Sequence, residues 1–541
     1  ISGEKGFFPY LMPYSPEWSG NPSLKIFDLK ALGDRRNDFD EWYANLDETW
    51  SYMGEMTKYC VQDVRILKDA MEQYRKDFME HVCAEQDPLA TVTQASLALN
   101  IFRRQYLTED TLYSPPDDQY EFIREAYKGG AVETFARIQD CMVGLQALYD
   151  CGIVADFNSL YPSKMFSELL PIKQAEFSPF DYSDMDPEDL FEHLHDENGE
   201  PLVGFIKCDI TCPDTNFPVL CVRKSGRLIF FAGSVKEEIF CLNEIHYALS
   251  VGYTITAIHK LLIFEESSRD VFKGYVSHFI KSKLEASAPP ENYDEFRRQC
   301  LESYGFDLGQ MQLNKAKRQS YKLLLNSLYG KMAQRNKSTT KLLNPAQFNR
   351  TLELVRDGFA EIQTVPMIQG GVILTDVLSL DTVQKNHNTN IQIAAYITAA
   401  GRIALNQKLR EVEAAGHADQ VSFCDTDSVG MICKKARIDF ELGNHLGDFV
   451  NEVPGDRFLS NMVATGPKTY ALRYMPRVGK SVEWFQMICP HQLNVGDTPW
   501  YVYEFLVGEV QDVIKCKGVS LKSNAHVATY KNFRRMATDP K

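Results

Sequence analysis

Phe423-Cys424-Asp425-Thr426-Asp427-Ser428 is the most informative stretch of this 541-residue chain. Two carboxylates stand one residue apart, and the apolar residues before them predict a strand that leads into a tight turn. Residues i and i+2 of a strand point the same way, and a tight turn can make such a pair converge. Hard cations favour several oxygen ligands within a small volume. Taken alone, Asp-x-Asp fits a surface turn better than a metal site, so other segments are needed to decide.

The composition is that of a globular protein with more than one compact unit. Hydrophobic residues make up 44%, no apolar run predicts a membrane span, and residues 1–6 do not resemble a signal peptide. The chain does not begin with Met, as expected of a fragment. Thirteen cysteines without a CxxC pair indicate reduced thiols, so we expect an intracellular location, cytoplasmic or nuclear, and no secretion. Irregular spacing favours buried thiols over zinc ligands for Cys208, Cys212, Cys221 and Cys241.

Charge is unevenly distributed along the chain. The net charge is −15, which by itself argues against a nucleic-acid partner. However, residues 467–541 hold eleven Lys and Arg against six Asp and Glu, and residues 311–335 hold six Lys and Arg and no acid. Because screening limits distant charges to roughly a Debye length, local basic stripes can bind phosphates on an acidic protein.

Hydrophobic patterning predicts helices and strands at several places. Helices are expected within residues 59–67, 86–125, 311–335 and 391–409, and a strand over residues 152–157. Gly330 is expected to end the third of these helices, since glycine commonly follows a helix C-terminus. Gly-Gly within residues 127–132 predicts a flexible element, and residues 336–385 are turn-rich, as in an insertion.

A further carboxylate, Asp156, stands at the end of the apolar strand. A sheet can deliver such a side chain to a site at its edge, and an ordinary turn is the alternative. Its occurrence together with Tyr161-Pro162 and with Asp425-Thr426-Asp427 favours a shared metal site.

The basic segment over residues 318–331 has a helical period. Arg318, Lys322 and Asn326 follow at i, i+4 and i+8 and share one face, with Tyr329 three residues further. The buried side is supplied by Leu324, Leu325 and Leu328. A solvated basic face is the simplest interpretation, but two cations, an amide and a tyrosine also suit a nucleoside triphosphate.

Together these segments resemble family B DNA polymerases. Residues 156–163, Asp-Phe-Asn-Ser-Leu-Tyr-Pro-Ser, look like the first palm motif of that family. Residues 322–330 look like its fingers motif and residues 425–428 like its third, metal-binding motif. Pro467-Lys468-Thr469-Tyr470 matches its Lys-x-Tyr element. Four motifs in this order and with plausible spacing are very specific.

A finer resemblance is to the protein-primed branch found in small phages, adenoviruses, linear plasmids and virus-like transposons. Tyr127-Lys128-Gly129-Gly130 matches the Tyr-x-Gly-Gly linker of that branch, and Lys515-Cys516-Lys517-Gly518 resembles its approach to the thumb. The long segments between the first and fingers motifs, and between the fingers and third motifs, fall where the branch carries two insertions.

The resemblance implies an α+β multidomain fold, a right hand of palm, fingers and thumb with two insertions. The C-terminal part of a ribonuclease H-like 3′–5′ exonuclease domain would precede it. The expected order is an exonuclease remnant (1–85), linker helices with the Tyr-x-Gly-Gly element (86–135), a first palm segment (136–170), a first insertion (171–295), fingers (296–335), a second insertion (336–388), a second palm segment (389–516) and a truncated thumb (517–541).

The exonuclease remnant carries one motif. Tyr59-Cys60-Val61-Gln62-Asp63 resembles the third exonuclease motif, with Tyr59 and Asp63 in the active positions. No Asp-x-Glu pair lies upstream, so the first motif is absent and exonuclease activity is doubtful. An amphipathic helix without this function is the alternative.

The resemblance also implies roles for the site residues, in a two-metal phosphoryl transfer with two Mg²⁺ ions and Mn²⁺ as the alternative. The expected metal ligands are Asp156, Asp427 and the Phe157 carbonyl, with Asp425 auxiliary and Lys322 as a proton donor. The expected nucleotide-binding residues are Phe157, Ser159, Leu160, Tyr161, Arg318, Lys322, Asn326 and Tyr329. The expected DNA-binding residues are Tyr127, Gly129, Gly130, Thr426, Lys468, Tyr470, Lys515 and Lys517.

The expected function is DNA-directed DNA polymerisation, with template-primer DNA, dNTPs and a terminal priming protein as partners and no membrane. One alternative is a catalytically inactive polymerase-like replication or DNA-binding protein. Others are a family member that extends ordinary nucleic-acid primers, and a nuclease. A reverse transcriptase would carry adjacent aspartates in place of Asp425-Thr426-Asp427.

Overall fold

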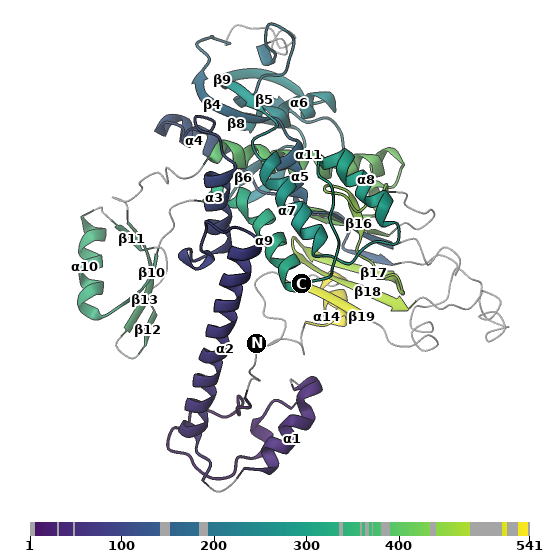
Figure 1. Ribbon diagram of the computed structural model, residues 1–541. Helices are drawn as coiled ribbons and strands as arrows, with labels where there is room; N and C mark the ends of the chain where they lie inside the picture. Colours follow the sequence, from purple (N-terminus) through teal and green to yellow (C-terminus); the bar gives the residue numbers. More distant parts are fainter. Residues whose placement is uncertain are drawn as a thin grey trace, which may run out of the picture. The chain divides into compact units, whose positions relative to one another are not determined.

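The computed structural model describes residues 6–29, 32–46, 49–140, 152–182, 193–334, 339–357, 360–362, 367–369, 372–379, 390–432, 440–476, 511–516 and 528–538. The chain divides into two compact units, Ile1–Ile101 and Phe102–Lys541 (Figure 1). Among the described residues, no helix combines the length and the apolar character that a membrane span needs.

Two helices characterise the first unit, α1 (Arg36–Ala44) and α2 (Tyr52–His81). The Ser51 side chain accepts a hydrogen bond from the Gly54 backbone and caps α2. The predicted helix over residues 59–67 is therefore confirmed as the middle of a longer one. The helical prediction for residues 86–125 is confirmed by α3 (Gln94–Gln105) and α4 (Asp117–Ala126).

The central sheet of the second unit has the strand order β1-β14-β15-β3-β16. Its strands are β1 (Val132–Thr134), β3 (Gly152–Phe157), β14 (Val421–Asp425), β15 (Ser428–Ile432) and β16 (Phe449–Asn451). Alternate side chains of β3 enter two different cores, because Ile153 and Ala155 pack with α11 (Ile391–Ala414) while Val154 packs against a second sheet. Because both faces of β3 are buried, its sequence is a nearly continuous apolar run and does not alternate between apolar and polar residues.

The second sheet has the order β19-β18-β17-β2 and carries the Lys-x-Tyr element. Its strands are β2 (Ile138–Asp140), β17 (Arg457–Gly466), β18 (Thr469–Pro476) and β19 (Gln511–Cys516). Helix α14 (Tyr530–Thr538) packs on this sheet through Phe533, and Arg534 forms an ion pair with Asp140 at 2.7 Å.

A third sheet, with the order β4-β9-β5-β8, occupies much of the predicted first insertion. Its strands are β4 (Leu170–Phe177), β5 (Gly204–Thr211), β8 (Ser234–Cys241) and β9 (Thr254–Ser268), and α6 (Leu242–Ser250) shares its core. Between β5 and β8 the chain forms a hairpin of β6 (Cys221–Lys224) and β7 (Arg227–Phe230). The four cysteines considered as zinc ligands are buried, as expected, and form no disulfide among the described residues.

Four helices pack together beside the central sheet: α5 (Leu160–Ser167), α7 (Lys273–Glu285), α9 (Lys315–Met332) and α11 (Figure 1). The Tyr275 hydroxyl of α7 donates a hydrogen bond to the Leu324 carbonyl of α9 (3.0 Å). The expectation that Gly330 ends α9 is wrong, because the helix continues to Met332, whose buried side chain extends its apolar face.

The described part of the predicted second insertion is more regular than its turn-rich sequence indicated. Strands β10 (Thr339–Leu343), β11 (Ala360–Ile362) and β12 (Met367–Gln369) all pair with β13 (Val372–Ser379). Asn344 and Gln347 form a capping box at the start of α10 (Pro345–Arg356).

Candidate active site

The Asp-x-Asp segment forms the turn between β14 and β15. Asp425 pairs with Ser428, which leaves Thr426 and Asp427 as the two turn residues. The backbone N–H of Asp427 donates to the Asp425 carbonyl (2.7 Å), and Thr426 adopts a positive φ of 67°. This tight turn points the two carboxylates into different surroundings.

Strand register brings Asp427 next to Asp156. Ser428 of β15 pairs with Asp156 of β3, and the backbone N–H of Phe157 donates to the Asp427 carbonyl (2.8 Å). Two carboxylates that are remote in sequence thereby meet at one end of the central sheet, where β3 ends and β15 begins, as the sequence predicted.

The two carboxylates have raised pKa values. Burial, followed by the negative charges of Asp427 and Glu452, raises the pKa of Asp156 to about 7. Burial and the charge of Asp425 likewise raise the pKa of Asp427. Simultaneous ionisation of the Asp156 and Asp427 carboxyl groups is therefore unfavourable unless a cation lies between them.

A cavity of about 510 Å³ opens above this pair. Arg318, Lys322 and Asn326 of α9 line it, so the predicted stripe does share one face. Asp156, Phe157, Ser159 and Asp427 line the same cavity. The Oδ1 atom of Asn326 is buried and has no hydrogen-bond partner among the described residues. A polar, cation-lined cavity with an unsatisfied buried oxygen suits a polar ligand.

Lys283 of α7 is a further cation in this cavity, which the sequence analysis missed. Its Nζ donates to the Asn158 Oδ1 (3.3 Å) and the Ser159 Oγ (3.2 Å), and the residue is only 5% exposed. Burial, and then the charges of Arg318 and Lys322, lower its pKa to about 8. A single lysine in an amphipathic helix gives no sequence signal, because only the packing of α7 against α9 brings it here.

Glu452 is a second residue that the sequence analysis missed. It directly follows β16, and its backbone N–H donates to the Val154 carbonyl (2.8 Å). It lines the cavity and contributes to the raised pKa of Asp156.

Tyr161 and Tyr329 contact each other and do not line the cavity. Their ring centroids are 4.2 Å apart with an interplanar angle of 35°. Tyr329 was expected to be available to a base, but its ring is engaged with Tyr161. Leu160, also a predicted nucleotide contact, is buried in the core beside α11.

Asp425 faces a second cavity, of about 930 Å³, on the side of the Lys-x-Tyr element. Its carboxylate forms ion pairs with Lys468 and with Lys515 (2.5 Å for Lys515). Burial alone would raise the pKa of Asp425, but hydrogen bonds from the two ammonium groups hold it below its usual value. Tyr470 stacks on Phe423 with centroids 4.2 Å apart. The predicted residue Lys517 lies outside the described residues.

The Gly-Gly element touches the Asp-x-Asp turn. The Thr426 N–H donates to the Ala131 carbonyl (2.6 Å), and a Cβ placed on Gly130 would lie 2.7 Å from the Thr426 Cγ2 and 2.9 Å from the Tyr161 hydroxyl. Only glycine therefore allows this approach.

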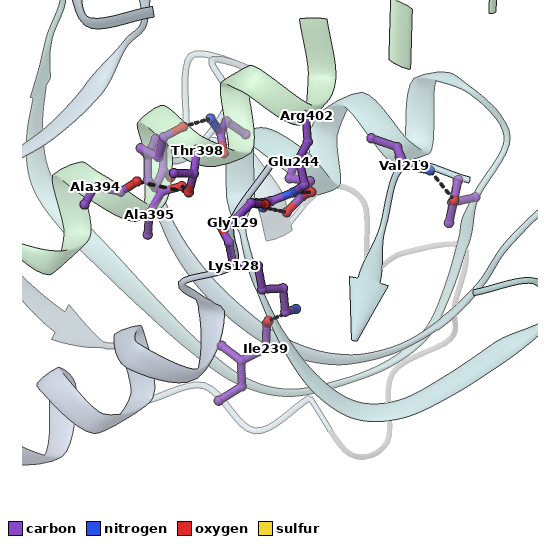
Figure 2. A network of polar contacts seen from close by, with 12 residues as sticks. Lys128, Gly129, Val219, Ile239, Glu244, Ala394, Ala395, Thr398 and Arg402 are labelled. Carbon is purple, nitrogen blue, oxygen red and sulfur yellow. Dashed lines mark hydrogen bonds and ion pairs between the residues drawn. The ribbon is translucent and has the colours of Figure 1, made fainter. Parts of the chain in front are cut away.

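A buried ion pair fixes the same element, which corrects the expectation that it is flexible (Figure 2). Arg402 of α11 pairs with Glu244 of α6 through two bonds of 2.7 and 2.8 Å. Its Nη1 also donates to the carbonyls of Lys128 (2.7 Å) and Gly129 (2.8 Å). The Lys128 ammonium is buried and donates to the Ile239 carbonyl (2.8 Å).

Tyr59 and Asp63, the predicted exonuclease residues, lie on α2 in the first unit. Their side chains are hydrogen-bonded to each other, and burial raises the pKa of Tyr59. Their spacing of one helical turn accounts for this contact.

The carboxylate pair fits a magnesium site. Nowhere in the described parts of the chain do three His, Cys, Asp or Glu side chains gather closely enough to bind a metal by themselves. Mg²⁺ usually takes one or two carboxylates and completes its shell with water and substrate phosphates, so a pair beside a cation-lined cavity suffices.

Comparisons with known proteins agree with this geometry. The family model described as DNA polymerase type B, organellar and viral, matches residues 3–414. A probable DNA polymerase of Ascobolus immersus is 25% identical over 418 residues, which are 75% of this chain and 29% of the relative. One of Neurospora intermedia is 22% identical over 474 residues, covering 85% and 42%. The chain thus spans less than half the length of these relatives.

Solved structures of phi29 DNA polymerase share the fold. An orthorhombic crystal form gives a TM-score of 0.54 at 19% identity, covering 88% of this chain and 68% of that one. A ternary complex with primer-template DNA and incoming nucleotide substrates gives 0.53 at 19% identity, covering 88% and 67%. The predicted α+β polymerase fold is confirmed, while the subdomain boundaries stay predictions. The family model matches most of the chain, and the chain therefore belongs to the type B DNA polymerases, organellar and viral.

Proposed function

We propose that this chain catalyses template-directed addition of dNTPs to a primer 3′-hydroxyl. The observation that carries the proposal is the pair of Asp156 and Asp427 beneath a cavity lined by cations. Phi29 DNA polymerase, which shares the fold, has been solved with primer-template DNA and incoming nucleotides, and this supports the same substrates here.

The incoming triphosphate would occupy the 510 Å³ cavity. Arg318, Lys322 and Lys283 present three cations to its phosphates, and the unsatisfied Asn326 oxygen offers an acceptor. Lys322, which lines the cavity, would donate a proton to the leaving pyrophosphate. Tyr161, supported by Tyr329, would pack under the sugar and exclude a 2′-hydroxyl.

Two Mg²⁺ ions would be held by Asp156, Asp427 and the Phe157 carbonyl. When bound, they would supply charge neutralisation and activate the primer hydroxyl. Asp156 and Asp427 orient the reacting groups at this end of the sheet, while Asp425 fixes the ammonium groups of Lys468 and Lys515 for the primer strand.

Primer extension with Mg²⁺ tests the polymerase activity. Asp156→Asn and Asp427→Asn should abolish extension while DNA binding persists. Asp425→Asn should be milder and should act mainly through weaker primer binding, because its carboxylate contacts lysines rather than the triphosphate cavity. Asp270→Asn, which changes an exposed carboxylate, is the control. Extension retained by the Asp427 variant would contradict the metal assignment. A wild-type chain that binds primed DNA without extending it would indicate an inactive DNA-binding relative.

We further propose that synthesis starts from a terminal priming protein, during replication of a linear viral or mobile-element genome inside the cell. The Tyr-x-Gly-Gly element at Tyr127 to Gly130 and the two long insertions support this branch. Transfer of a labelled dNMP onto a protein hydroxyl tests it. Extension of nucleic-acid primers only, with no protein labelling in the presence of the priming protein, would contradict it.

A further inference from the structure

The β6–β7 hairpin carries a strongly basic tip. Lys224 pairs with Arg227, and Ser225 and Gly226 form the turn with positive φ values of 49° and 74°. Arg223, Lys224 and Arg227 are all exposed, and residues 221–233 contain no Asp or Glu. Three positive charges therefore project from one short turn.

The base of this hairpin is anchored in packed cores. Val222 and Phe231 belong to the core of the third sheet. Phe230, at the end of β7, packs instead against the core of the central sheet. An arm that is anchored on both sides holds its tip in a defined place relative to the catalytic sheet.

The hairpin lies directly against the Gly-Gly element. The Nη2 of Arg223 donates to the Tyr127 carbonyl (3.2 Å), and a Cβ on Gly129 would lie 4.0 Å from the Leu228 Cδ1. The Gly129 carbonyl also accepts a hydrogen bond from Arg402 (Figure 2). Next along the chain, Gly130 contacts Thr426 of the catalytic turn. The basic tip is thus tied to the active site through a continuous set of short contacts.

The charges of the tip are available to a ligand. Lys224 and Arg227 are exposed, and neither has an ion-pair partner within the described part of the chain. Exposed cations without partners gain most from a polyanion, because phosphate neutralisation releases condensed counterions.

If the polyanion is DNA, the positions of the two cavities indicate which of its strands binds the hairpin tip. The triphosphate cavity and the cavity beside Lys468 both include Asp156 and Asp427 in their lining, and account for the nucleotide and the primer. The Gly-Gly element and the hairpin line neither of them. The Gly-Gly side is adjacent to Tyr161 and is open to a third strand, the one that pairs with the incoming nucleotide.

We propose that the β6–β7 hairpin is a phosphate-binding arm that holds the backbone of the single-stranded template as it approaches the active site. Arg223 supports the Gly-Gly element, while Lys224 and Arg227 contact phosphates without reading bases. The inference rests on the proposed function only in taking DNA as the substrate.

The test is equilibrium binding of fluorescent DNA to the whole chain without Mg²⁺ or dNTP, over a series of salt concentrations. The variant Lys224→Gln/Arg227→Gln should bind a duplex with a single-stranded template overhang roughly tenfold more weakly, with a salt slope reduced by about 0.7 for each lost phosphate contact. Binding of the same duplex without the overhang should be unchanged. Lys236→Gln, which removes an exposed charge on β8, should behave as the wild type.

Two results would overturn the proposal. One is an unchanged salt slope for the overhang substrate, and the other is equal weakening for both substrates, which would assign the arm to the duplex. Both variants change exposed residues, and unaltered melting temperatures would show that the fold is intact. Because binding needs no catalysis, a chain that bound DNA but failed to extend primers would refute the proposed function and leave this test valid.

Discussion

At the scale of single residues, Gly130 leaves no room for a side chain beside the catalytic turn. Gly130→Ala would place a Cβ 2.7 Å from the Thr426 Cγ2 and 3.2 Å from its Cα, which belongs to the catalytic turn. A displacement of about 1 Å at reacting groups costs roughly a hundredfold in rate, so kcat should fall by about that factor. Single-turnover extension measures this. Gly129→Ala is the matched control, since its Cβ would meet nothing closer than 4.0 Å. Equal losses in the two variants would refute the steric explanation.

The lowered pKa of Lys283 leads us to expect that nucleotide binding depends on pH. Its pKa lies at about 8 because of burial and its two cationic neighbours, Arg318 and Lys322. The lysine is charged below that pH and neutral above it, so an attractive charge is lost as pH rises. We expect KM for dNTP to increase several-fold between about pH 7 and about pH 9. Lys283→Arg should flatten the profile because a guanidinium stays charged. An identical profile in that variant would exclude Lys283 as the titrating group.

At the scale of elements, the pair of Arg402 and Glu244 joins α11 to α6. Both side chains are 1% exposed. Arg402→Met would leave a buried carboxylate without its partner, which typically costs about 3–5 kcal/mol of unfolding free energy. Urea unfolding measures this loss. Arg297→Met breaks an exposed pair with Asp307 and should leave the unfolding free energy nearly unchanged, because solvent screens that pair. Restored stability in Arg402→Met/Glu244→Leu would show that the unpaired charge causes the loss.

Patterning predicted most of the elements near the site, and its errors have local causes. The strand that ends at Phe157, the buried helix α11 and the basic face of α9 follow from period and composition. Gly330 was taken as a helix end because glycine often is one, but burial of Met332 favours two more helical residues. Residues 127–132 were taken as flexible, since sequence does not show that Arg402 binds the Lys128 and Gly129 carbonyls.

At the scale of the whole molecule, the first unit carries the contact of Tyr59 with Asp63 without an upstream Asp-x-Glu. We expect this chain to lack 3′–5′ exonuclease activity, because two-metal hydrolysis needs carboxylates from more than one motif. Incubation of 5′-labelled single-stranded DNA with Mg²⁺ measures it. Asp63→Ala should leave primer extension unchanged. If the wild-type chain shortened the DNA and the Asp63→Ala variant did not, the expectation would be wrong.

The sequence alone determined the family-specific motifs, the carboxylates and the basic helical face, because these depend on residue type and on spacing within one element. The tertiary structure decided their surroundings. Strand register placed Asp427 beside Asp156. Packing of the two sheets placed Asp425 where it forms ion pairs with Lys468 and Lys515. Packing of α7 on α9 added Lys283 to the cavity. The physical reason is that charge interactions fall off with distance in space, and a sequence does not record which distant segments share a cavity.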